Sequence, residues 1–472
     1  MTPLWTAAEA AEATEGATTG DWSTSGLSID TRSILPGEMF VALTDRRDGH
    51  DFVADALAKG ASAALVSRVP EDVAKDAPLL LVPDVLEALR AMAKHRRATS
   101  QAKIAAITGS VGKTSTKEML RAALAREGNV HAAEMSFNNH WGVPLTLARC
   151  PKEADFAVIE IGMNHPGEIA PLAELAAPDV AVITTVAAAH VEAFPDGLPG
   201  IAREKSAIYA GLKPDGAAIY NADLDTTPIL AGAAALHGWP IAFGMDAESP
   251  YRLLSTELAR DKTEIAAELR GDPIRFALDT LGRHFAMNAL AVIAAADALG
   301  ADRERVLAGL EEWRPPPGRG TREEIPLPQG SFELYDDAYN ANPTSLGAAL
   351  EVLAAAEPGP GGKRIAILGD MLELGPEEIA LHAGVATHPS LVSADKVHCS
   401  GPRMSALWSV LPPDRQGLRA DQAAELAAQV ADLVQPNDIV LVKGSKGSLV
   451  SVVVDALRQL GQADPEAVRG TS

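Results

Sequence analysis

The sequence predicts a soluble α/β protein of three domains, the central one built on a parallel sheet with helices on both faces. The chain has 472 residues, and a domain usually contains roughly 100–200 residues, so two to four domains are expected. Short apolar runs alternate with helical stretches along most of the chain, which is typical of parallel strands covered by helices. A Pro- and Gly-rich segment at 314–320 fits neither a helix nor a central strand, and we interpret it as a stiff linker.

These breaks give expected domains at 1–100, 101–314 and 315–472. The first contains short apolar runs and turn signals and closes with an Ala-rich helix at 84–100. The second opens with an apolar strand at 104–108 and continues with strand candidates at 156–159 and 180–184. The third resumes the alternation, with strand candidates at 332–335, 364–368 and 439–443.

Composition excludes several classes of function. Acidic residues outnumber basic ones by 63 to 41, for a formal net charge of −22, and such a field repels nucleic acid and anionic membrane surfaces. The two cysteines, Cys150 and Cys399, are too few for a disulfide framework or a cysteine metal cage, which fits a reducing cytoplasm. The N-terminus lacks the basic and apolar parts of a signal peptide, and no apolar stretch is long enough to span a membrane.

The strongest local motif is a phosphate-binding loop. Thr-Gly-Ser-Val-Gly-Lys-Thr-Ser at 108–115 follows the apolar strand and leads into an amphipathic helix. Gly109 and Gly112 let the backbone N–H groups face phosphate oxygens, Lys113 adds a cation, and Thr114 offers a hydroxyl to Mg²⁺. Ile107 stands where the usual pattern has its first Gly, so the loop is shortened. The motif predicts a phosphate-loop ATPase-like central sheet, without separating a kinase, an ATPase or a ligase.

Two further residues are metal-ligand candidates. Glu160 ends the strand at 156–159, and ligands in open α/β sheets bind at the carboxyl ends of strands. A carboxylate there suits Mg²⁺; a solvated strand-end acid is about equally consistent with this residue alone, but the nearby phosphate loop favours the metal. His190 follows an apolar stretch, and taken by itself it is more often a loop or core histidine than a ligand.

Lys205 lies in an apolar stripe. If 201–212 is a helix, Ile201, Lys205, Ile208 and Leu212 share one face. Burial disfavours a charged amine, and a neutral amine is a nucleophile that carbon dioxide can convert to a carbamate able to ligate Mg²⁺. The alternative is a lysine whose ammonium reaches water along an apolar stem, and the residues alone favour that alternative.

Together these motifs resemble the Mur ligase family. The phosphate loop is followed in family order by blocks at 160–168, 184–190 and 202–205. More specific blocks are Phe-Asn-Asn at 137–139 with 142–146, Asp-Asp-Ala-Tyr-Asn-Ala-Asn-Pro at 336–343, Leu-Gly-Asp-Met-Leu-Glu-Leu-Gly at 368–375, and Val-Lys-Gly-Ser-Lys-Gly at 442–447. N-terminal blocks lie at 30–32, 36–43 and 48–52. The resemblance runs from about 28 to 448.

The resemblance implies an ATP-dependent ligase that joins D-alanyl-D-alanine to a UDP-N-acetylmuramoyl tripeptide through an acyl phosphate. Such a reaction belongs to peptidoglycan synthesis, and hence to cell-wall biogenesis, cell shape and cell division. It implies ATP, two Mg²⁺ ions and a carbamate on Lys205, in a cytoplasmic protein that we expect to be a monomer. The small N-terminal α/β domain would bind the UDP end of the acceptor, the central domain ATP, and the Rossmann-like C-terminal domain the dipeptide while closing over ATP.

The resemblance also assigns residues. Lys113, His190 and Lys205 would be catalytic, and Thr114, Glu160, His190 and Lys205 would bind metal. ATP would be bound by Gly109, Ser110, Val111, Gly112, Lys113, Thr114, Ser115, Asn288, Arg319 and Asp337. The acceptor or dipeptide would contact Thr31, Arg32, Asp48, His50, Asn138, Asn139 and Asn342. The chain departs from the family pattern at Thr31 and Ala338, where Ser is usual, and at 285–287 before Asn288.

Two alternatives remain open. One is a sister ligase that adds a single amino acid, as a muramyl tripeptide synthetase or a folylpolyglutamate synthetase-like enzyme does. The chain lacks the Asp-Asn-Pro-Arg tetrapeptide of the diaminopimelate-adding enzyme, which argues against that branch. The other is a non-catalytic ATP-binding regulatory module, which would not need Lys113, Thr114, Glu160, His190 and Lys205 together.

Overall fold

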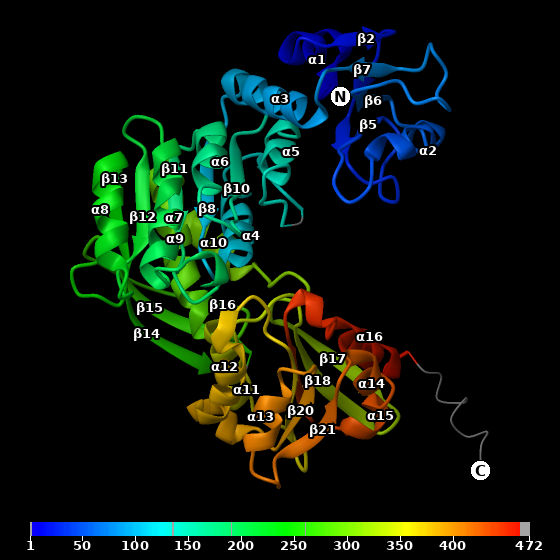
Figure 1. Ribbon diagram of the computed structural model, residues 1–472. Helices are drawn as coiled ribbons and strands as arrows, with labels where there is room; N and C mark the ends of the chain where they lie inside the picture. The colour runs from blue at the N-terminus through cyan, green and yellow to red at the C-terminus, as the bar shows by residue number, and fades with distance from the viewer. Residues whose placement is uncertain (1, 135, 190, 260, 463–472) are drawn as a thin grey trace.

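The computed structural model describes residues 2–134, 136–189, 191–259 and 261–462. Figure 1 shows an N-terminal domain in blue, a central domain in cyan and green, and a C-terminal domain from yellow to red. In the part of the chain that the structure describes, the main sheets of the three domains have five, nine and six strands respectively. The predicted fold class, an α/β protein of three domains with a largely parallel central sheet, is confirmed. Within the described residues, no helix combines the length and apolarity that crossing a bilayer requires.

The N-terminal sheet has the order β2-β7-β6-β5-β4 and is parallel except for its β2–β7 edge. The predicted helix at 84–100 is confirmed as α3. It begins after Asp84, whose side chain caps it by accepting hydrogen bonds from the N–H groups of Leu86 and Glu87. The elements are β1 (Trp5–Thr6), α1 (Ala7–Thr14), β2 (Ala17–Thr19), β3 (Ser23–Thr24), β4 (Gly26–Ser28), β5 (Glu38–Val41), α2 (Val53–Ala58), β6 (Ala63–Val66), β7 (Leu79–Leu81) and α3 (Val85–Thr99).

The central sheet has the order β16-β15-β14-β13-β12-β11-β8-β10-β9, parallel from β14 to β9 and antiparallel in its β14–β15–β16 extension. Its strands are β8 (Lys103–Thr108), β9 (Val130–Ala132), β10 (Phe156–Glu160), β11 (Val180–Ile183), β12 (Ala217–Asn221), β13 (Trp239–Gly244), β14 (Tyr251–Ala259), β15 (Lys262–Leu269) and β16 (Asp272–Leu278). Its helices are α4 (Lys113–Leu124), α5 (Gly142–Ala148), α6 (Ile169–Ala176), α7 (Leu198–Ser206), α8 (Thr227–His237), α9 (Arg283–Leu299) and α10 (Arg303–Glu311).

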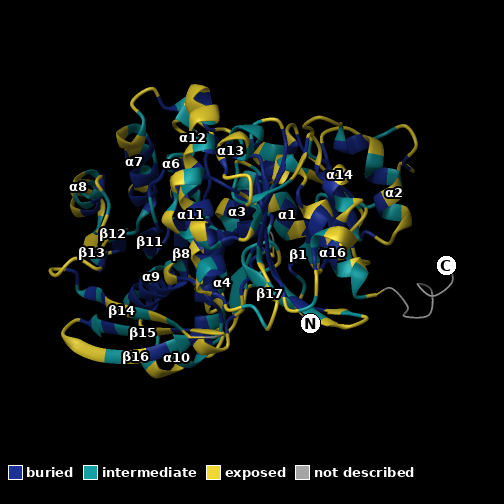
Figure 2. Cartoon of the chain, turned by 90° about the horizontal axis from the view of Figure 1, so that it is seen from below, coloured by how far each residue is buried: buried dark blue, intermediate teal, exposed yellow. Residues whose placement is uncertain are grey.

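Helices cover both faces of the central sheet, as predicted. Along β8, Ala105 and Ile107 pack in the cluster that includes α4, α9 and α10, whereas Ile104 and Ala106 pack in the cluster that includes α5 to α8. This division follows from the two-residue period of a strand. In Figure 2 helix α9 and the strands around β8 and β11 are correspondingly dark blue.

The predicted continuous helix at 201–212 is wrong in its extent. Helix α7 ends at Ser206 and the chain continues as a 3₁₀ helix, η3 (Ala207–Gly211). Gly211, at the end of η3, packs directly against the backbone of Ala173 on α6, where a Cβ would collide. This close contact accompanies the change from an α-helix to the tighter 3₁₀ helix. The shared face nevertheless holds, since Ile201, Lys205 and Ile208 are buried, and only Leu212 is half-buried.

The C-terminal sheet has the order β17-β18-β22-β19-β20-β21 and is parallel except for the β17–β18 hairpin. All three predicted strands are present. The elements are β17 (Thr321–Leu327), β18 (Gly330–Asp337), α11 (Pro343–Ala355), β19 (Arg364–Gly369), α12 (Glu378–Gly384), β20 (Lys396–Ser400), α13 (Ser405–Val410), β21 (Gln416–Ala420), α14 (Ala423–Ala427), α15 (Val430–Leu433), β22 (Ile439–Lys443) and α16 (Ser451–Leu460).

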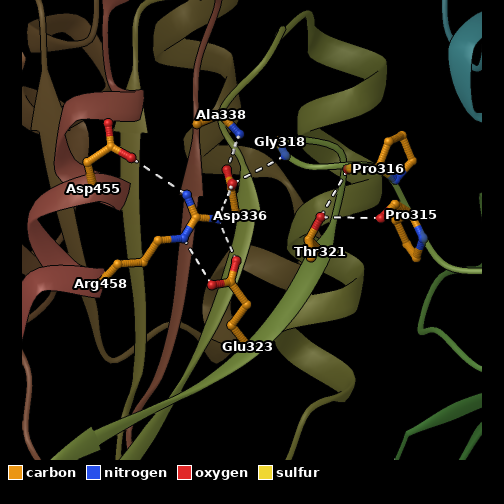
Figure 3. A network of polar contacts seen from close by, with 9 residues as sticks. All are labelled: Pro315, Pro316, Gly318, Thr321, Glu323, Asp336, Ala338, Asp455 and Arg458. Carbon is orange, nitrogen blue, oxygen red and sulfur yellow. Dashed lines mark hydrogen bonds and ion pairs between the residues drawn. The ribbon is translucent and has the colours of Figure 1, made fainter. Parts of the chain in front are cut away.

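The segment at 314–320 forms neither helix nor strand, as predicted, and it is tied to the C-terminal domain (Figure 3). The Asp336 carboxylate accepts hydrogen bonds from the N–H groups of Gly318 and Ala338, each at 3.2 Å, and pairs with Arg458 at 2.8 Å. The Thr321 hydroxyl donates to the Pro316 carbonyl at 2.9 Å. The linker is therefore held as a fixed loop.

Candidate active site

The candidate site is a cleft between the carboxyl ends of two parallel sheets. In the central sheet, β11, β8 and β10 are neighbours, and in the C-terminal sheet, β18, β22 and β19 are neighbours. Loops at carboxyl ends are where open α/β sheets bind ligands. A cavity of about 420 Å³ lies between them, lined from the central side by residues 110–115, Ser136, Asn138, Asn139, Glu160 and Asn288, and from the other side by Arg319, Asp337, Tyr339, Asn342 and Lys443.

The phosphate loop is fixed by contacts with the end of β11. The Ser110 N–H donates to the Thr185 carbonyl at 2.8 Å, and the Thr184 hydroxyl donates to the Val111 carbonyl at 2.6 Å. Gly112, with φ of 89°, begins α4 in a backbone conformation that favours glycine. These contacts connect the shortened loop to the end of the neighbouring strand.

Lys113 extends back over the phosphate loop. Its ammonium donates to the Gly109 carbonyl at 2.6 Å. Burial is the main cause that lowers the pKa of Lys113, Glu160 opposes the shift, and Arg319 adds to it. The loop, this cation and the start of α4 together form a site suited to an anionic phosphate.

Asn288 on α9 lies against the phosphate loop. A Cβ at Gly112 would come within 2.9 Å of its side-chain oxygen. The unusual segment before it, at 285–287, begins with Phe285, which is buried and packs edge-on against Trp313 with ring centres 5.2 Å apart. A Cβ at Gly320 would lie 3.5 Å from the Phe285 ring. Phe285 therefore fills the space under the linker, which explains a large apolar side chain at this position.

Glu160 accepts two side-chain hydrogen bonds on the central-domain side of the cleft. It is 2% exposed and accepts hydrogen bonds from the Thr114 hydroxyl at 2.9 Å and the Asn138 amide at 2.8 Å. A hydroxyl and a carboxylate that meet beside a phosphate loop are a suitable donor set for Mg²⁺, which keeps several waters and needs only one or two carboxylates.

A complete protein cage for a metal is not found in the part of the chain that the structure describes: no group of three or more His, Cys, Asp and Glu side chains is close enough together. His190, the third predicted ligand, lies outside the described residues. The donor set of Thr114 and Glu160 fits Mg²⁺ held jointly with water and phosphate oxygens.

Lys205 is fully buried, at 2% exposed, and is not one of the residues that line the cleft. An ammonium that reaches water along an apolar stem is therefore not what the structure contains. Burial lowers the pKa of Lys205 well below its ordinary value, and the nearby positive charge of Lys113 lowers it further. The amine is thus neutral far more readily than that of an exposed lysine.

The C-terminal side of the cleft contains an ion pair between the buried Lys443 and the half-buried Asp337. The Lys443 ammonium donates to the Asp337 carboxylate at 2.6 Å and to the Asn340 carbonyl at 3.0 Å. Burial raises the pKa of Asp337, and Lys443 opposes that shift. Lys443 was not among the predicted site residues, although it ends a predicted strand, and that position is the signal that identifies it.

Arg319 connects the two sides of the cleft. It donates to the Ser136 hydroxyl of the central domain at 3.2 Å, and its guanidinium lies 4.2 Å from the centre of the Tyr339 ring. Gly318 and Gly320 on either side have φ of 75° and 91°. The fixed linker therefore presents Arg319 towards the phosphate loop, where its charge also acts on Lys113.

The three predicted asparagines line this cleft and also have structural contacts. Asn139 accepts a hydrogen bond from the Gly142 N–H at 2.9 Å, next to the start of α5. Asn342 caps α11 by accepting from the Ser345 N–H at 2.9 Å, and the Ser345 hydroxyl completes the capping box. Asn138 contacts Glu160. Their contacts with substrate stay a prediction.

The predicted N-terminal residues lie at a different place. Thr31, Arg32 and His50 line a second cavity of about 800 Å³, which the central domain completes with His140 and Trp141. Asp48 holds this loop: its carboxylate lies 2.6 Å from His50 Nδ1, and His50 Nε2 accepts from the Ser67 N–H at 2.9 Å. Hydrogen bonds from His50 and Arg68 keep the pKa of Asp48 well below its usual range.

Comparison with known proteins agrees with this architecture. Three family models match the chain: "Mur ligase family, catalytic domain" at residues 23–97, "Mur ligase middle domain" at 107–296, and "Mur ligase, glutamate ligase domain" at 322–446. The UDP-N-acetylmuramoyl-tripeptide–D-alanyl-D-alanine ligase of Escherichia coli (strain K12) is 36% identical over 448 residues, 93% of this chain and 95% of the relative. The chain belongs to the Mur ligase family.

Other Mur ligases extend the likeness. The Bacillus subtilis (strain 168) enzyme of the same name is 33% identical and covers 92% of this chain and 93% of its own. A crystal structure of MurF from Acinetobacter baumannii has a TM-score of 0.82, 31% identity, and coverage of 96% and 98% of the two chains. MurF from Thermotoga maritima in complex with ADP has a TM-score of 0.77 with 26% identity, over 93% of this chain and 98% of the other.

Proposed function

We propose that this Mur ligase joins D-alanyl-D-alanine to UDP-N-acetylmuramoyl-tripeptide with ATP, giving the pentapeptide, ADP and phosphate for peptidoglycan synthesis. The observation that carries the proposal is the cleft, which combines a phosphate loop on one sheet with a polar, cation-bearing edge on the other. Its full-length relatives of that name support the choice of substrates. Within this proposal, residues 1–100 bind the UDP end of the acceptor, 101–314 bind ATP, and 315–472 bind the dipeptide and close over ATP.

The first chemical step activates the acceptor carboxylate, whose oxygen is otherwise a poor leaving group. A carboxylate oxygen bonds to the γ-phosphorus, the bond to the bridging oxygen breaks, and ADP leaves with the electron pair. The phosphoryl oxygens carry the charge, so catalysis is mainly positioning and neutralisation. Lys113 and Arg319, which approach from opposite sides of the cleft, supply fixed positive charge to that region.

The second step forms the amide bond. The free amine of the dipeptide attacks the carbonyl carbon of the acyl phosphate, and the tetrahedral intermediate expels phosphate as the amine loses a proton. Water would hydrolyse the acyl phosphate, so the two sheet edges must exclude it during this step. The cleft geometry, with the C-terminal edge facing the phosphate loop, supports delivery of the amine from the C-terminal side.

Thr114 and Glu160 would hold Mg²⁺, with His190 as a further ligand of a two-ion site. Bound Mg²⁺ supplies additional neutralisation of phosphate charge. Lys205 would react as a neutral amine with carbon dioxide, forming an N–C bond and losing a proton, to give an anionic carbamate that contributes to this site. Its full burial and lowered pKa support this assignment, because a carbamate forms from the uncharged amine.

Removing the Lys205 amine tests the carbamate. Lys205→Ala is expected to be inactive in phosphate release and to regain part of the activity in acetate, which replaces the missing carboxylate. Lys213→Ala is the matched control, because that lysine is 40% exposed and pairs with Asp179 at 2.9 Å, and it should retain activity without acetate. Full activity of Lys205→Ala would exclude the carbamate role.

The function itself is tested by phosphate release from ATP and Mg²⁺ with UDP-N-acetylmuramoyl-tripeptide, with and without D-alanyl-D-alanine. Release that requires the dipeptide, and a product heavier by one dipeptide unit in mass spectrometry, is the expected result. Release only with a single amino acid and a shorter acceptor would assign the chain to a sister ligase. No release with any acceptor would favour an ATP-binding regulatory module.

We further propose that the enzyme acts as a cytoplasmic monomer with no nucleic-acid partner. The net charge of −22 supports the absence of nucleic-acid binding. Light scattering with and without substrates is expected to give the mass of one chain, and the mass of two chains would contradict the monomer.

A further inference from the structure

Among the described residues, the lysines and arginines that line the cleft already have polar partners. Lys113 contacts the phosphate loop, Arg319 contacts Ser136, and Lys443 is paired with Asp337. Lys446 is not one of these lining residues, but it lies beside Tyr339, which is. Lys446 is exposed, its ammonium lies 5.6 Å from the centre of the Tyr339 ring, and no carboxylate of the described residues forms an ion pair with it.

The turn that carries Lys446 is held firmly at its base. It lies in the 3₁₀ helix η7 (Lys446–Ser448), which Gly444 and Ser445 separate from the carboxyl end of β22. The preceding residue, Ser445, is buried; its N–H donates to the Asp370 carbonyl at 3.0 Å, and its hydroxyl accepts from the Leu372 N–H at 3.0 Å. The backbone before Lys446 is therefore held in place, and the exposed Lys446 side chain is available to bind a small anion.

The neighbours of this cation indicate which ligand it meets. Tyr339 lines the cleft on the C-terminal side, and the lining continues along the start of α11 with Thr344, Ser345 and Ala348. Hydroxyl groups and a small methyl group suit a short peptide with small side chains better than they suit a triphosphate. A dipeptide that presents its amine to the acyl phosphate still has a carboxylate at its other end, and that charge requires a cation in a protein of net charge −22.

We propose that Lys446 binds the terminal carboxylate of the incoming dipeptide and makes the enzyme select for a free C-terminal acid. The inference rests on the proposed function and deepens it by naming the residue that reads the far end of the amine substrate. Lys446 acts here as a specificity residue: no bond forms or breaks at its ammonium, and its contact fixes the distance between the carboxylate anchor and the reacting amine.

The test compares D-alanyl-D-alanine with D-alanyl-D-alanine amide, which differ only in the terminal charge. The wild-type enzyme should prefer the acid by roughly ten- to a hundred-fold in kcat/KM, as expected for one charge-assisted contact. Lys446→Met should lose this preference by raising KM for the acid while leaving kcat and the KM for ATP nearly unchanged. Lys446→Arg should retain the preference for the acid.

The matched control is Lys363→Met. Lys363 is an exposed lysine directly before β19, at the amino ends of the same parallel strands whose carboxyl ends face the cleft. This variant should behave as the wild type does. A Lys446→Met enzyme that still prefers the acid would overturn the inference. So would a Lys446→Met enzyme in which the KM for ATP rises and the KM for the dipeptide does not. A wild-type enzyme that does not use D-alanyl-D-alanine at all would instead contradict the proposed function, so the two failures are distinguishable.

Discussion

The central domain meets its two neighbours through surfaces of opposite character. On the N-terminal side, Leu145 and Ala148 of α5 belong to the apolar core cluster of the N-terminal domain. The fully buried Trp5 donates from Nε1 to the Ala148 carbonyl at 2.9 Å, and the Arg96 guanidinium lies 4.3 Å from its ring centre. This joint is continuous with a hydrophobic core, so separating the two domains would expose that core to water.

The C-terminal side of the central domain is mostly polar. Arg319 contacts Ser136 at 3.2 Å across the cleft, and Gly375 lies beside Glu192, to whose side chain a Cβ on the glycine would come within 3.4 Å. Apolar contact comes from Leu281, which packs in a C-terminal core cluster, and from the half-buried Leu258. Polar faces are solvated when they part, so opening this joint costs less than opening the other.

This difference between the two joints suggests different roles for the N-terminal and C-terminal domains. The N-terminal domain shares an apolar core cluster with α5 of the central domain, so we expect the second cavity to keep its distance from the phosphate loop. The C-terminal domain faces the phosphate loop across a cleft that substrates must enter and leave. Changes at the first joint should therefore affect stability, and changes at the cleft should affect turnover.

The largest expected effect on stability is that of Trp5→Ala. Removing this buried ring should lower the free energy of unfolding by about 3–5 kcal/mol, because a cavity forms at the apolar joint. Urea denaturation followed by tryptophan fluorescence measures it. Trp239→Ala is the matched control, since that ring is 55% exposed, and its removal should change stability by about 0.5 kcal/mol or less. Equal effects would contradict the fixed joint.

A change at the cleft should lower turnover and leave stability nearly unchanged, in contrast to a change at the N-terminal joint. Lys113→Ala removes a fixed charge from the phosphate loop and should lower kcat/KM by roughly a hundred- to a thousand-fold, while the thermal midpoint stays within a few degrees. Coupled phosphate-release kinetics and calorimetry measure the two quantities. Lys94→Ala, at an exposed lysine of α3, should leave both unchanged. A folded Lys113→Ala enzyme with normal turnover would contradict the proposed role of the phosphate loop in catalysis.

The sequence predicted best what depends on neighbours along the chain. The strands at 104–108 and 439–443 follow from short apolar runs, and the phosphate loop from its glycines. Helical spacing correctly placed Lys205 in an apolar stripe, even though α7 gives way to a 3₁₀ turn after Ser206. The residues alone favoured an ammonium that reaches water, and the structure shows it buried. Helix ends are hard to predict because, as here, the packing of one glycine against another helix decides them.

Contacts between distant segments could not be predicted in this way. Asp337 and Lys443 are 106 residues apart, and they meet because β18 and β22 are adjacent and parallel. The order of strands in a sheet is a tertiary property that no local pattern specifies. The distinction between the two neighbouring acids has the same origin: Asp336 faces the linker and Arg458, while Asp337 lines the cleft.

The smallest effect that distinguishes the two regions is that of a single methyl group on the linker. Gly318 has φ of 75°, and a Cβ there would lie 3.1 Å from Tyr339 Cβ, whereas Gly361 has φ of 80° with nothing within 4 Å. Both alanine variants should lose about 1–2 kcal/mol of stability, because a left-handed backbone is strained for any L-residue with a side chain. Only Gly318→Ala also displaces the loop that carries Arg319, so only it should raise the KM for ATP, by roughly tenfold or less. If both variants raised that KM equally, the loss of affinity would come from general destabilisation, and the linker would have no separate part in binding the nucleotide.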